Sequence, residues 1–202
     1  MKKINPLDSE YMYDRRIPIV LNLFEKRLRI SLGFVNIDDN SNVLDIGSNN
    51  GKLLKMIRER NSKCKCYGID TLIKADIKDC DIRIADATDM PFTDNQFQII
   101  FVLDVLEHIK NYNKVISEIY RVLEPNGTLI LSGPTELFFY KLCRFLWLRK
   151  FEEKEHEERT IFEIERAIEK NGFELVSRKK LPNVPFISLF RISKYIKDEK
   201  EI

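Results

Sequence analysis

Short apolar runs alternate with stretches of helical apolar spacing from about residue 43 onward. The runs are typical of buried strands, and the spacing predicts amphipathic helices between them. We predict strands at Val43–Ile46, Cys64–Ile69, Ile82–Ala85, Gln96–Leu103 and Thr128–Ser132, and helices at Lys52–Glu59, near Leu72–Ile77 and at Asn111–Leu123. This alternation indicates an α/β fold, in which a doubly wound, mostly parallel sheet carries helices on both faces. Ligands of such folds bind at the carboxyl ends of the strands.

The segments that flank this region also have helical or strand patterns. Apolar positions on one side of Asp8–Ser31, with Arg and Lys on the other, predict an N-terminal helix that Pro18 kinks or breaks. Later segments predict an apolar helix, a charged helix with an isoleucine seam and a strand, at Leu137–Leu148, Glu152–Lys170 and Phe173–Leu181. The residues from Phe186 onward are ambiguous between a strand and an amphipathic helix.

The segment Val43–Leu54, VLDIGSNNGKLL, has the most specific pattern in the chain. A strand ends there in a glycine-rich turn before a helix, which exposes backbone N–H groups to a ligand. The spacing from Gly47 to Gly51 excludes the ordinary phosphate loop, and Asn49 and Lys52 stand where the dinucleotide fingerprint needs glycines. Two interpretations stay open, a loop that bends around a small nucleoside and a plain strand–helix turn without a ligand.

An acid ends or follows each of the first four predicted strands, namely Asp45, Asp70, Asp86 and Asp104. The ends of parallel strands meet at one edge of the sheet, so these carboxylates repel each other unless donors satisfy them. The ribose hydroxyls and the exocyclic amine of a nucleoside are such donors. The alternative for each acid is a local cap on the following helix, which Asp often provides.

Composition and charge limit the classes of protein to which the chain can belong. Of the 202 residues, 44% are hydrophobic, and 34 basic against 32 acidic residues leave a net charge of +2. These values favour one globular domain and give no electrostatic reason to expect a nucleic-acid partner. The N-terminus lacks the apolar run of a signal peptide, and no apolar stretch is long enough to span a membrane. Cys64 and Cys66 are too close for the usual zinc spacing, so we expect reduced core cysteines, no metal and a cytoplasmic location.

Five motifs together are informative about family: VLDIGSNNG, YGID, IADATDMPFTDNQFQIIFVLDVLEHI, RVLEPNGTLILSGP and HEERTIFEIERAIEKNGFELVSRKKL. This set resembles the S-adenosylmethionine-dependent methyltransferases of the seven-stranded Rossmann-like type, and among them the small-molecule branch that includes the ubiquinone and menaquinone biosynthesis enzymes. The resemblance covers roughly Asn36 to Leu181. It implies one methyltransferase domain over residues 1–202, with an N-terminal helix at 8–33, a cofactor-binding core at 36–135, a helical cap at 136–170 and C-terminal strands or a helix at 171–202.

The resemblance implies S-adenosylmethionine as cofactor, S-adenosylhomocysteine as product, and methyl transfer to a small organic acceptor. An oxygen or carbon nucleophile is favoured, because the motif of amino-group methylating enzymes does not follow Leu103. Two other functions stay open. One is a cofactor-binding partner protein without transferase activity, and the other is a nicotinamide-dependent oxidoreductase, which the failed dinucleotide fingerprint disfavours.

The resemblance also implies roles for residues around the cofactor's methionine part. The loop there would be formed by Asp45, Gly47, Ser48, Asn49 and Gly51. The family usually has glycine where this chain has Asn49, and Asn tolerates left-handed backbone better than most residues do. Leu103 and Asp104 would lie under the methionine part.

A second group of residues would hold the adenosine part. Asp70 would accept hydrogen bonds from the ribose hydroxyls, with Thr71 and Leu72 beside the adenine. Asp86 would accept a hydrogen bond from the adenine amine, and Ala87 would donate its backbone N–H to the ring.

The sequence indicates the residues for catalysis and for acceptor binding less specifically than those for the cofactor. His108 is a candidate base, because its ordinary pKa of about 6.5 suits proton transfer, and local packing is the alternative. Tyr11 and Tyr13 would bond the cofactor carboxylate or line the pocket. Phe138 and Phe139, on an aromatic segment with basic neighbours, would suit an acceptor with a long apolar part and an anionic head, and leave peripheral membrane contact open. For the N-terminal segment with the two tyrosines and for the aromatic segment with Phe138 and Phe139, ordinary packing on the protein is the alternative.

Overall fold

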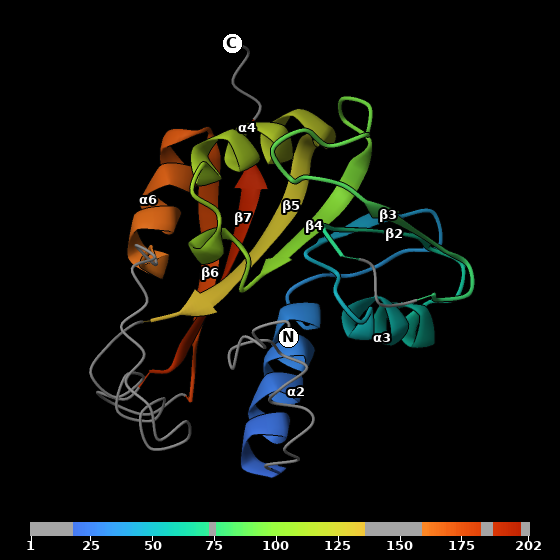
Figure 1. Cartoon of the computed structure of the whole chain (residues 1–202), viewed down its shortest axis with the longest axis horizontal. Coiled ribbons are helices and arrows are strands. Elements are labelled where there is room, and N and C mark those ends of the chain that lie inside the picture. Colours follow the sequence, from blue (N-terminus) through green and yellow to red (C-terminus); the bar gives the residue numbers. More distant parts are fainter. Residues whose placement is uncertain (1–17, 73–75, 136–158, 183–187, 199–202) are drawn as a thin grey trace, which may run out of the picture.

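Seven strands form one sheet in the order β3-β2-β1-β4-β5-β7-β6 (Figure 1). The computed structural model of the chain describes residues 18–72, 76–135, 159–182 and 188–198. The strands are β1 Asn42–Ile46, β2 Lys65–Asp70, β3 Cys80–Ile84, β4 Phe97–Leu103, β5 Leu123–Pro134, β6 Phe173–Leu181 and β7 Phe190–Lys197. Strands β1 to β5 are parallel, whereas β7 is antiparallel to β5 and to β6. The predicted mostly parallel α/β sheet is confirmed, and the ambiguous C-terminal segment forms a strand.

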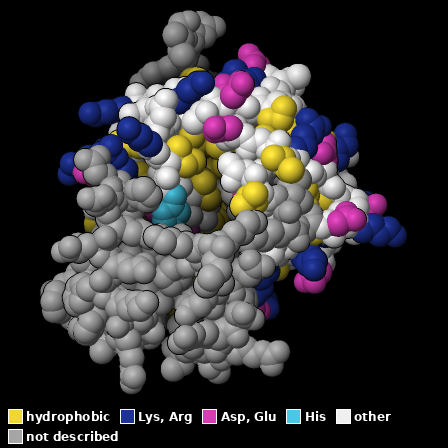
Figure 2. Space-filling model, viewed as in Figure 1, with side chains coloured by type: hydrophobic (Ala, Val, Ile, Leu, Met, Phe, Trp, Pro, Cys, Tyr) yellow, Lys and Arg dark blue, Asp and Glu magenta, His cyan; other side chains and the backbone are white. Residues whose placement is uncertain are grey.

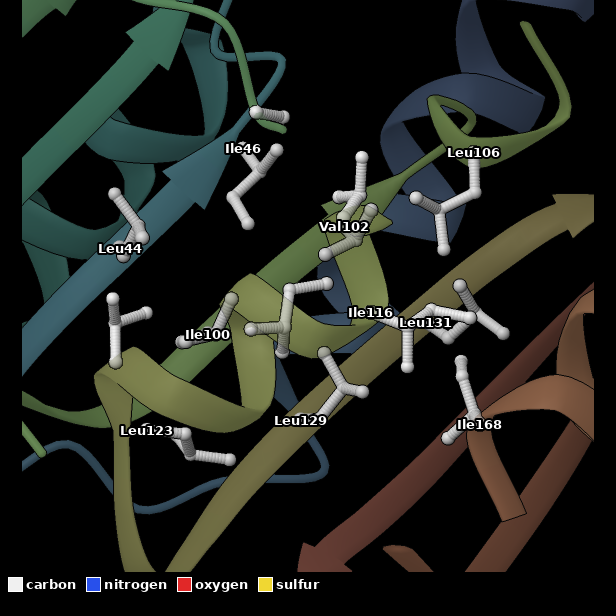
Figure 3. Packing of buried hydrophobic residues seen from close by; sticks show 14 of the residues in the cluster. Leu44, Ile46, Ile100, Val102, Leu106, Ile116, Leu123, Leu129, Leu131 and Ile168 are labelled. Atoms are coloured by element: carbon white, nitrogen blue, oxygen red, sulfur yellow. The ribbon is translucent and has the colours of Figure 1, made fainter. Parts of the chain in front are cut away.

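Helices α4 (Tyr112–Val122) and α6 (Ile161–Lys170) cover one face of the sheet. Alternate residues of a strand point to opposite faces, so a strand between two helical layers must be apolar on both sides. On this face Leu44, Ile100 and Leu129 belong to one buried cluster with the apolar residues of α4 and α6. Figure 3 shows how side chains from these three strands and both helices converge in this cluster.

Helices α2 (Pro18–Leu32) and α3 (Lys52–Arg60) belong to the opposite face. The intervening strand residues Val43, Phe101 and Ile130 are buried there together with the apolar residues of these two helices. The sheet is therefore doubly wound, as the alternation of strands and helices predicted. Among the helices of the described ranges, none is long and apolar enough to cross a membrane.

Four predicted elements need correction or qualification. The predicted helix near Leu72–Ile77 is wrong where the structure describes it, because Leu72 lies in a bend and Asp76 and Ile77 are not helical. The bend has a local cause, since the Leu72 backbone N–H donates to the Asp70 carboxylate at 3.0 Å. Residues 73–75 lie outside the described residues.

Strand β5 begins at Leu123 and not at the predicted Thr128, because Pro125-Asn126-Gly127 form a bulge within the strand. The pairing with β4 shifts there from Phe97 opposite Leu123 to Ile99 opposite Thr128. Asn126 has a φ of 62°, the left-handed conformation that such a bulge needs.

The N-terminal helix α2 begins at Pro18. Proline suits the first helical position, where the missing N–H would have no intrahelical acceptor. Tyr11, Tyr13, Phe138, Phe139 and the predicted helix at 137–148 lie outside the described residues. The division of residues 1–202 into one domain with a helical cap also stays a prediction.

Helix α6 starts at the carboxyl end of β5. Its first residue, Ile161, packs so closely on Gly133 that a Cβ at Gly133 would lie 2.8 Å from Ile161 Cδ1. A capping box fixes this start, because Glu163 N donates to Thr160 Oγ1 at 3.4 Å and Thr160 N donates to Glu163 Oε2 at 3.1 Å. The predicted helix Glu152–Lys170 ends at Lys170 as expected, and Gly172 follows it with a φ of 85°. The predicted start of this helix is wrong where the structure describes it, because Arg159 and Thr160 are not helical.

Candidate ligand site at the carboxyl edge of the sheet

The carboxyl edge, defined as the edge where β1 to β5 end, contains the point at which the strand order reverses. The chain proceeds outward from β1 to β2 and β3, and then returns to β4 on the other side of β1. In such folds ligands usually bind between the loops that follow the two strands at this reversal, here β1 and β4. Gly47, in the first loop, has a φ of 78°, and a Cβ there would overlap the side chain of Val105 in the second loop.

The loop after β1 is folded tightly against β2. Gly47 N and Ser48 N both donate to Ile69 O, at 2.8 and 3.0 Å, and Gly51 N donates to Ser48 O at 2.7 Å. Asn49 has a φ of 41° and Gly51 a φ of 67°. Asn49 thus adopts the left-handed backbone that its side chain tolerates, so the departure from glycine at this position does not prevent the turn.

Ser48 has a buried hydroxyl for which the described residues offer no hydrogen-bond partner. Its Oγ lies over Gly68, where an added Cβ would be 2.9 Å away. A buried polar atom without a partner costs free energy, so its retention calls for an explanation such as an absent ligand or a water.

Asp45 is a second buried polar group at this place. It lies in β1 beside Gly68 of β2, and it is 5% exposed. Burial raises the pKa of the Asp45 carboxyl to about 8, and the negative charge of Asp70 adds to the rise. Within the described part of the chain, no donor or cation pairs with this carboxyl.

Asp70 and Asp86 are held by backbone N–H groups of their own loops. The two oxygens of Asp70 accept from Asn49 N at 2.9 Å and from Leu72 N at 3.0 Å. Asp86 accepts from Thr88 N at 2.8 Å, and this hydrogen bond lowers the pKa of the Asp86 carboxyl. These backbone N–H groups partly satisfy the carboxylates and so reduce the predicted repulsion between the acids. This agrees with the alternative of local capping.

The residues that the resemblance places beside the adenine, namely Thr71, Leu72 and Ala87, lie at the same edge. Thr71 and Leu72 are exposed, and Leu72 is 67% exposed, which is unusual for a large apolar side chain. Ala87 is buried in the cluster under helix α4. These residues leave an apolar side chain in solvent next to the Asp70 carboxylate.

Asp104 follows β4 and has a φ of 57°. Its carboxylate forms an ion pair with Arg27 of helix α2, and Ser132 Oγ donates to it at 3.4 Å. Leu103 is half-buried immediately before it. The basic residues of the N-terminal helix were expected on its polar side, which is wrong for Arg27, because Arg27 is buried. Its spacing of three residues from Phe24 was the signal that could have revealed a buried position.

His108 ends the short 3₁₀ helix η1 (Leu106–His108), where its side chain is exposed. Figure 2 shows a hollow on this face of the molecule, with hydrophobic side chains along its sides and a histidine at its edge. The cysteines Cys64 and Cys66 are buried and free, as expected, and lie away from this edge at the start of β2. The edge therefore combines one buried acid, Asp45, with the half-buried Asp70 and Asp104 and the exposed Asp86 and His108.

The fold is similar to that of solved methyltransferases. An S-adenosylmethionine-dependent methyltransferase from Mesorhizobium loti superposes with a TM-score of 0.65 at 11% identity, covering 85% of this chain and 96% of that chain. At this identity the likeness shows the fold alone.

Sequence comparison identifies relatives over part of the chain. The ubiquinone/menaquinone biosynthesis C-methyltransferase UbiE of Rickettsia bellii is 32% identical over 107 residues, which are 45% of this chain and 43% of that protein. The sterol 4-C-methyltransferase strm-1 of Caenorhabditis elegans is 31% identical over 107 residues, covering 48% of this chain and 32% of that protein. The match thus spans less than half the length of these curated relatives.

A family model described as a methyltransferase domain matches residues 13–178. This range contains all the acids of the carboxyl edge and most of the 202 residues. The chain therefore belongs to the methyltransferase-domain family.

Proposed function

We propose that this protein transfers a methyl group from S-adenosylmethionine to a small organic acceptor. The observation that carries the proposal is a pair of buried polar groups at the strand-order reversal. The Ser48 hydroxyl lacks a hydrogen-bond partner among the described residues, and burial beside Asp70 raises the pKa of the Asp45 carboxyl. Buried polar groups are normally hydrogen-bonded. The charged amino-acid part of S-adenosylmethionine would supply the missing donors, and the family membership of the chain points to this ligand.

The adenosine part would lie toward β2 and β3. Each carboxylate oxygen can accept two hydrogen bonds, so Asp70 retains capacity for ribose hydroxyls beyond its two backbone donors. The exposed Leu72 would cover one face of the adenine, which would explain a large apolar side chain in solvent. Asp86 and the Ala87 N–H would meet the ring edge.

Bound S-adenosylmethionine would bring a methyl group on a positively charged sulfur, already activated for displacement. The chain would then contribute mainly positioning and the exclusion of water. The close contact between Gly47 and Val105 fixes the loops after β1 and β4 relative to each other, and Leu103 and Asp104 would form the floor of the site.

His108 is our candidate for the group that accepts a proton from the acceptor. It is exposed at the end of η1, just after β4, at the edge of the sheet where an acceptor would enter. His108→Asn should lower the single-turnover rate and leave the dissociation constant of S-adenosylmethionine unchanged. A fall in melting temperature without a slower chemical step would instead mean that His108 is structural.

We further propose that the acceptor is a carbon atom of an apolar molecule. Both relatives described above are named as C-methyltransferases, one for quinone biosynthesis and one for sterols. Mass spectrometry after incubation with a reduced naphthoquinone, a sterol and a polar phenol would identify the class that gains a methyl group. An apolar acceptor would bring this protein to a membrane surface from the cytoplasm, which co-sedimentation with anionic vesicles at low salt would test.

Calorimetry with S-adenosylmethionine, S-adenosylhomocysteine, NAD and ATP tests the cofactor directly. We expect binding of the first two ligands and none of the others. Tight binding of NAD without S-adenosylmethionine would support the oxidoreductase alternative and overturn this proposal. Binding of S-adenosylmethionine with no methylated product from any acceptor would favour the non-catalytic partner protein.

Asp70→Ala should weaken binding of S-adenosylhomocysteine by about 1.5–3 kcal/mol, the range for hydrogen bonds to a charged group. Asp39→Ala is a matched control, because Asp39 precedes β1 and pairs with Lys63 at 2.8 Å on the surface. If both variants bind like the wild type, the ligand does not lie at Asp70.

A further inference from the structure

Arg27 is a buried cation at the carboxyl edge that comes from outside the sheet. Its side chain is 7% exposed and pairs with Asp104, whose side chain is 20% exposed. The guanidinium carbon lies 4.7 Å from the ring centroid of Phe24 and 4.9 Å from that of Phe190. Two aromatic rings and one carboxylate therefore confine the guanidinium to one position.

The two rings come from distant parts of the chain. Phe24 belongs to the same helix as Arg27, and Phe190 is the first residue of β7, opposite Pro134 at the end of β5. The ring centroids are 5.9 Å apart with the planes at 58°. This aromatic contact attaches α2 to the sheet beside the carboxyl end of β5. Arginine over aromatic faces gains cation–π attraction, which is larger when the site is desolvated.

The Asp104 carboxylate depends on the ion pair with Arg27 for its orientation. A φ of 57° is uncommon for a residue other than glycine, and the residue directly precedes the loop that faces Gly47. Its other side-chain contact in the described ranges, with Ser132 Oγ, is long at 3.4 Å. The guanidinium is thus the strongest group that orients this carboxylate.

We propose that Arg27 is a positioning residue, which acts on ligand binding through Asp104. The proposal rests on the proposed function, in which Asp104 lies under the methionine part of the cofactor. The buried guanidinium keeps the carboxylate charged and turned toward the ligand position, so that its remaining lone pairs accept from the ligand. Helix α2 thereby becomes part of the binding site without itself touching the ligand.

The test is a double-mutant cycle on the dissociation constant of S-adenosylhomocysteine, measured by calorimetry well below the melting temperature. Arg27→Met should weaken binding about 10- to 100-fold, and Arg27→Lys should restore part of the loss. Asp104→Asn should cause a similar loss. Adding Arg27→Met to Asp104→Asn should then change little, because the group on which Arg27 acts has already lost its charge.

Two control variants separate positioning from support of the helix. Leu28→Ala removes a buried contact of α2 away from the ion pair, so it should lower the melting temperature and leave the dissociation constant unchanged. Arg29→Met removes an exposed pair with Glu25 on the same helix and should change neither.

Two outcomes overturn the proposal. One is an Arg27→Met variant that binds like the wild type, and the other is an equally large further loss when Arg27→Met is added to Asp104→Asn. Failure of the wild type to bind S-adenosylmethionine and S-adenosylhomocysteine would overturn the proposed function and this proposal together. Wild-type binding with an unaffected Arg27→Met variant would overturn this proposal alone.

Discussion

At the scale of single residues, the acids of the carboxyl edge differ in what pairs with them. Asp104 has a guanidinium, and Asp70 and Asp86 have backbone N–H groups. Asp45 has none of these within the described chain. Because its pKa is raised from 3.8 to about 8, it takes up a proton on folding at pH values between these two.

This uptake predicts a pH-dependent cost of Asp45 to stability. The unfolded carboxyl ionises near its ordinary pKa of 3.8, and the folded one near 8, so its contribution to stability falls as pH rises between these values. Asp45→Asn should therefore stabilise the fold at pH 8 by about 1–3 kcal/mol, the penalty for an unsatisfied buried group. The gain should shrink toward pH 4.

Urea denaturation at several pH values measures this difference. Asp39→Asn, at an exposed acid that pairs with Lys63, is the control and should show no such trend. An Asp45→Asn variant that is less stable than the wild type at pH 8 would contradict the assigned burial cost.

The strand pattern correctly predicted that the four acids lie at the carboxyl edge of the sheet, but it did not predict the contacts across that edge. Gly47 was expected to leave room for a ligand, yet its missing Cβ also leaves room for Val105, 58 residues later in the chain. A Gly47→Val variant would therefore disturb the packing of two loops as well as a ligand. Arg27 was missed for the same reason, since its partners Asp104 and Phe190 are distant in sequence.

At the scale of elements, apolar patterns within one segment predicted helices and strands reliably. Features that depend on contacts with other residues, such as bends and bulges, were not predicted. Apolar runs predicted the first five strands to within a few residues, because both faces of each central strand are buried. The helix near residue 72 was wrong, because the Asp70 carboxylate draws the chain into a bend. The bulge in β5 depends on pairing with β4, which no local pattern contains.

The capping box of α6 predicts a measurable contribution to stability. Thr160→Ala removes the acceptor of the Glu163 N–H and should destabilise the fold by about 1 kcal/mol. Ser117→Ala is the control, because the exposed Ser117 hydroxyl only bonds back to Asn113 O within α4. Equal unfolding free energies for Thr160→Ala and the wild type would show that the cap is not formed in solution.

At the scale of the whole molecule, a ligand that binds the folded state alone must raise the unfolding temperature. At a hundred times its dissociation constant, S-adenosylhomocysteine should stabilise the fold by about 2.7 kcal/mol. For a chain of this size that corresponds to roughly 5–10 °C. Differential scanning calorimetry should show the rise in the wild type and a smaller one in Asp70→Ala at the same ligand concentration. No rise at saturating ligand would contradict binding to the folded state.

The reversed direction of β7 has a consequence for how the protein is made. Because this strand starts at the carboxyl edge, its first residue, Phe190, completes the aromatic support of Arg27 on a helix near the other end of the sequence. During synthesis, β1 to β5 leave the ribosome well before Phe190 does. A nascent chain halted after β5 would hold the glycine loop and all four acids, yet its Arg27 would lack one of its two rings. Of the described strands, the last to be translated thus completes the surroundings of helix α2.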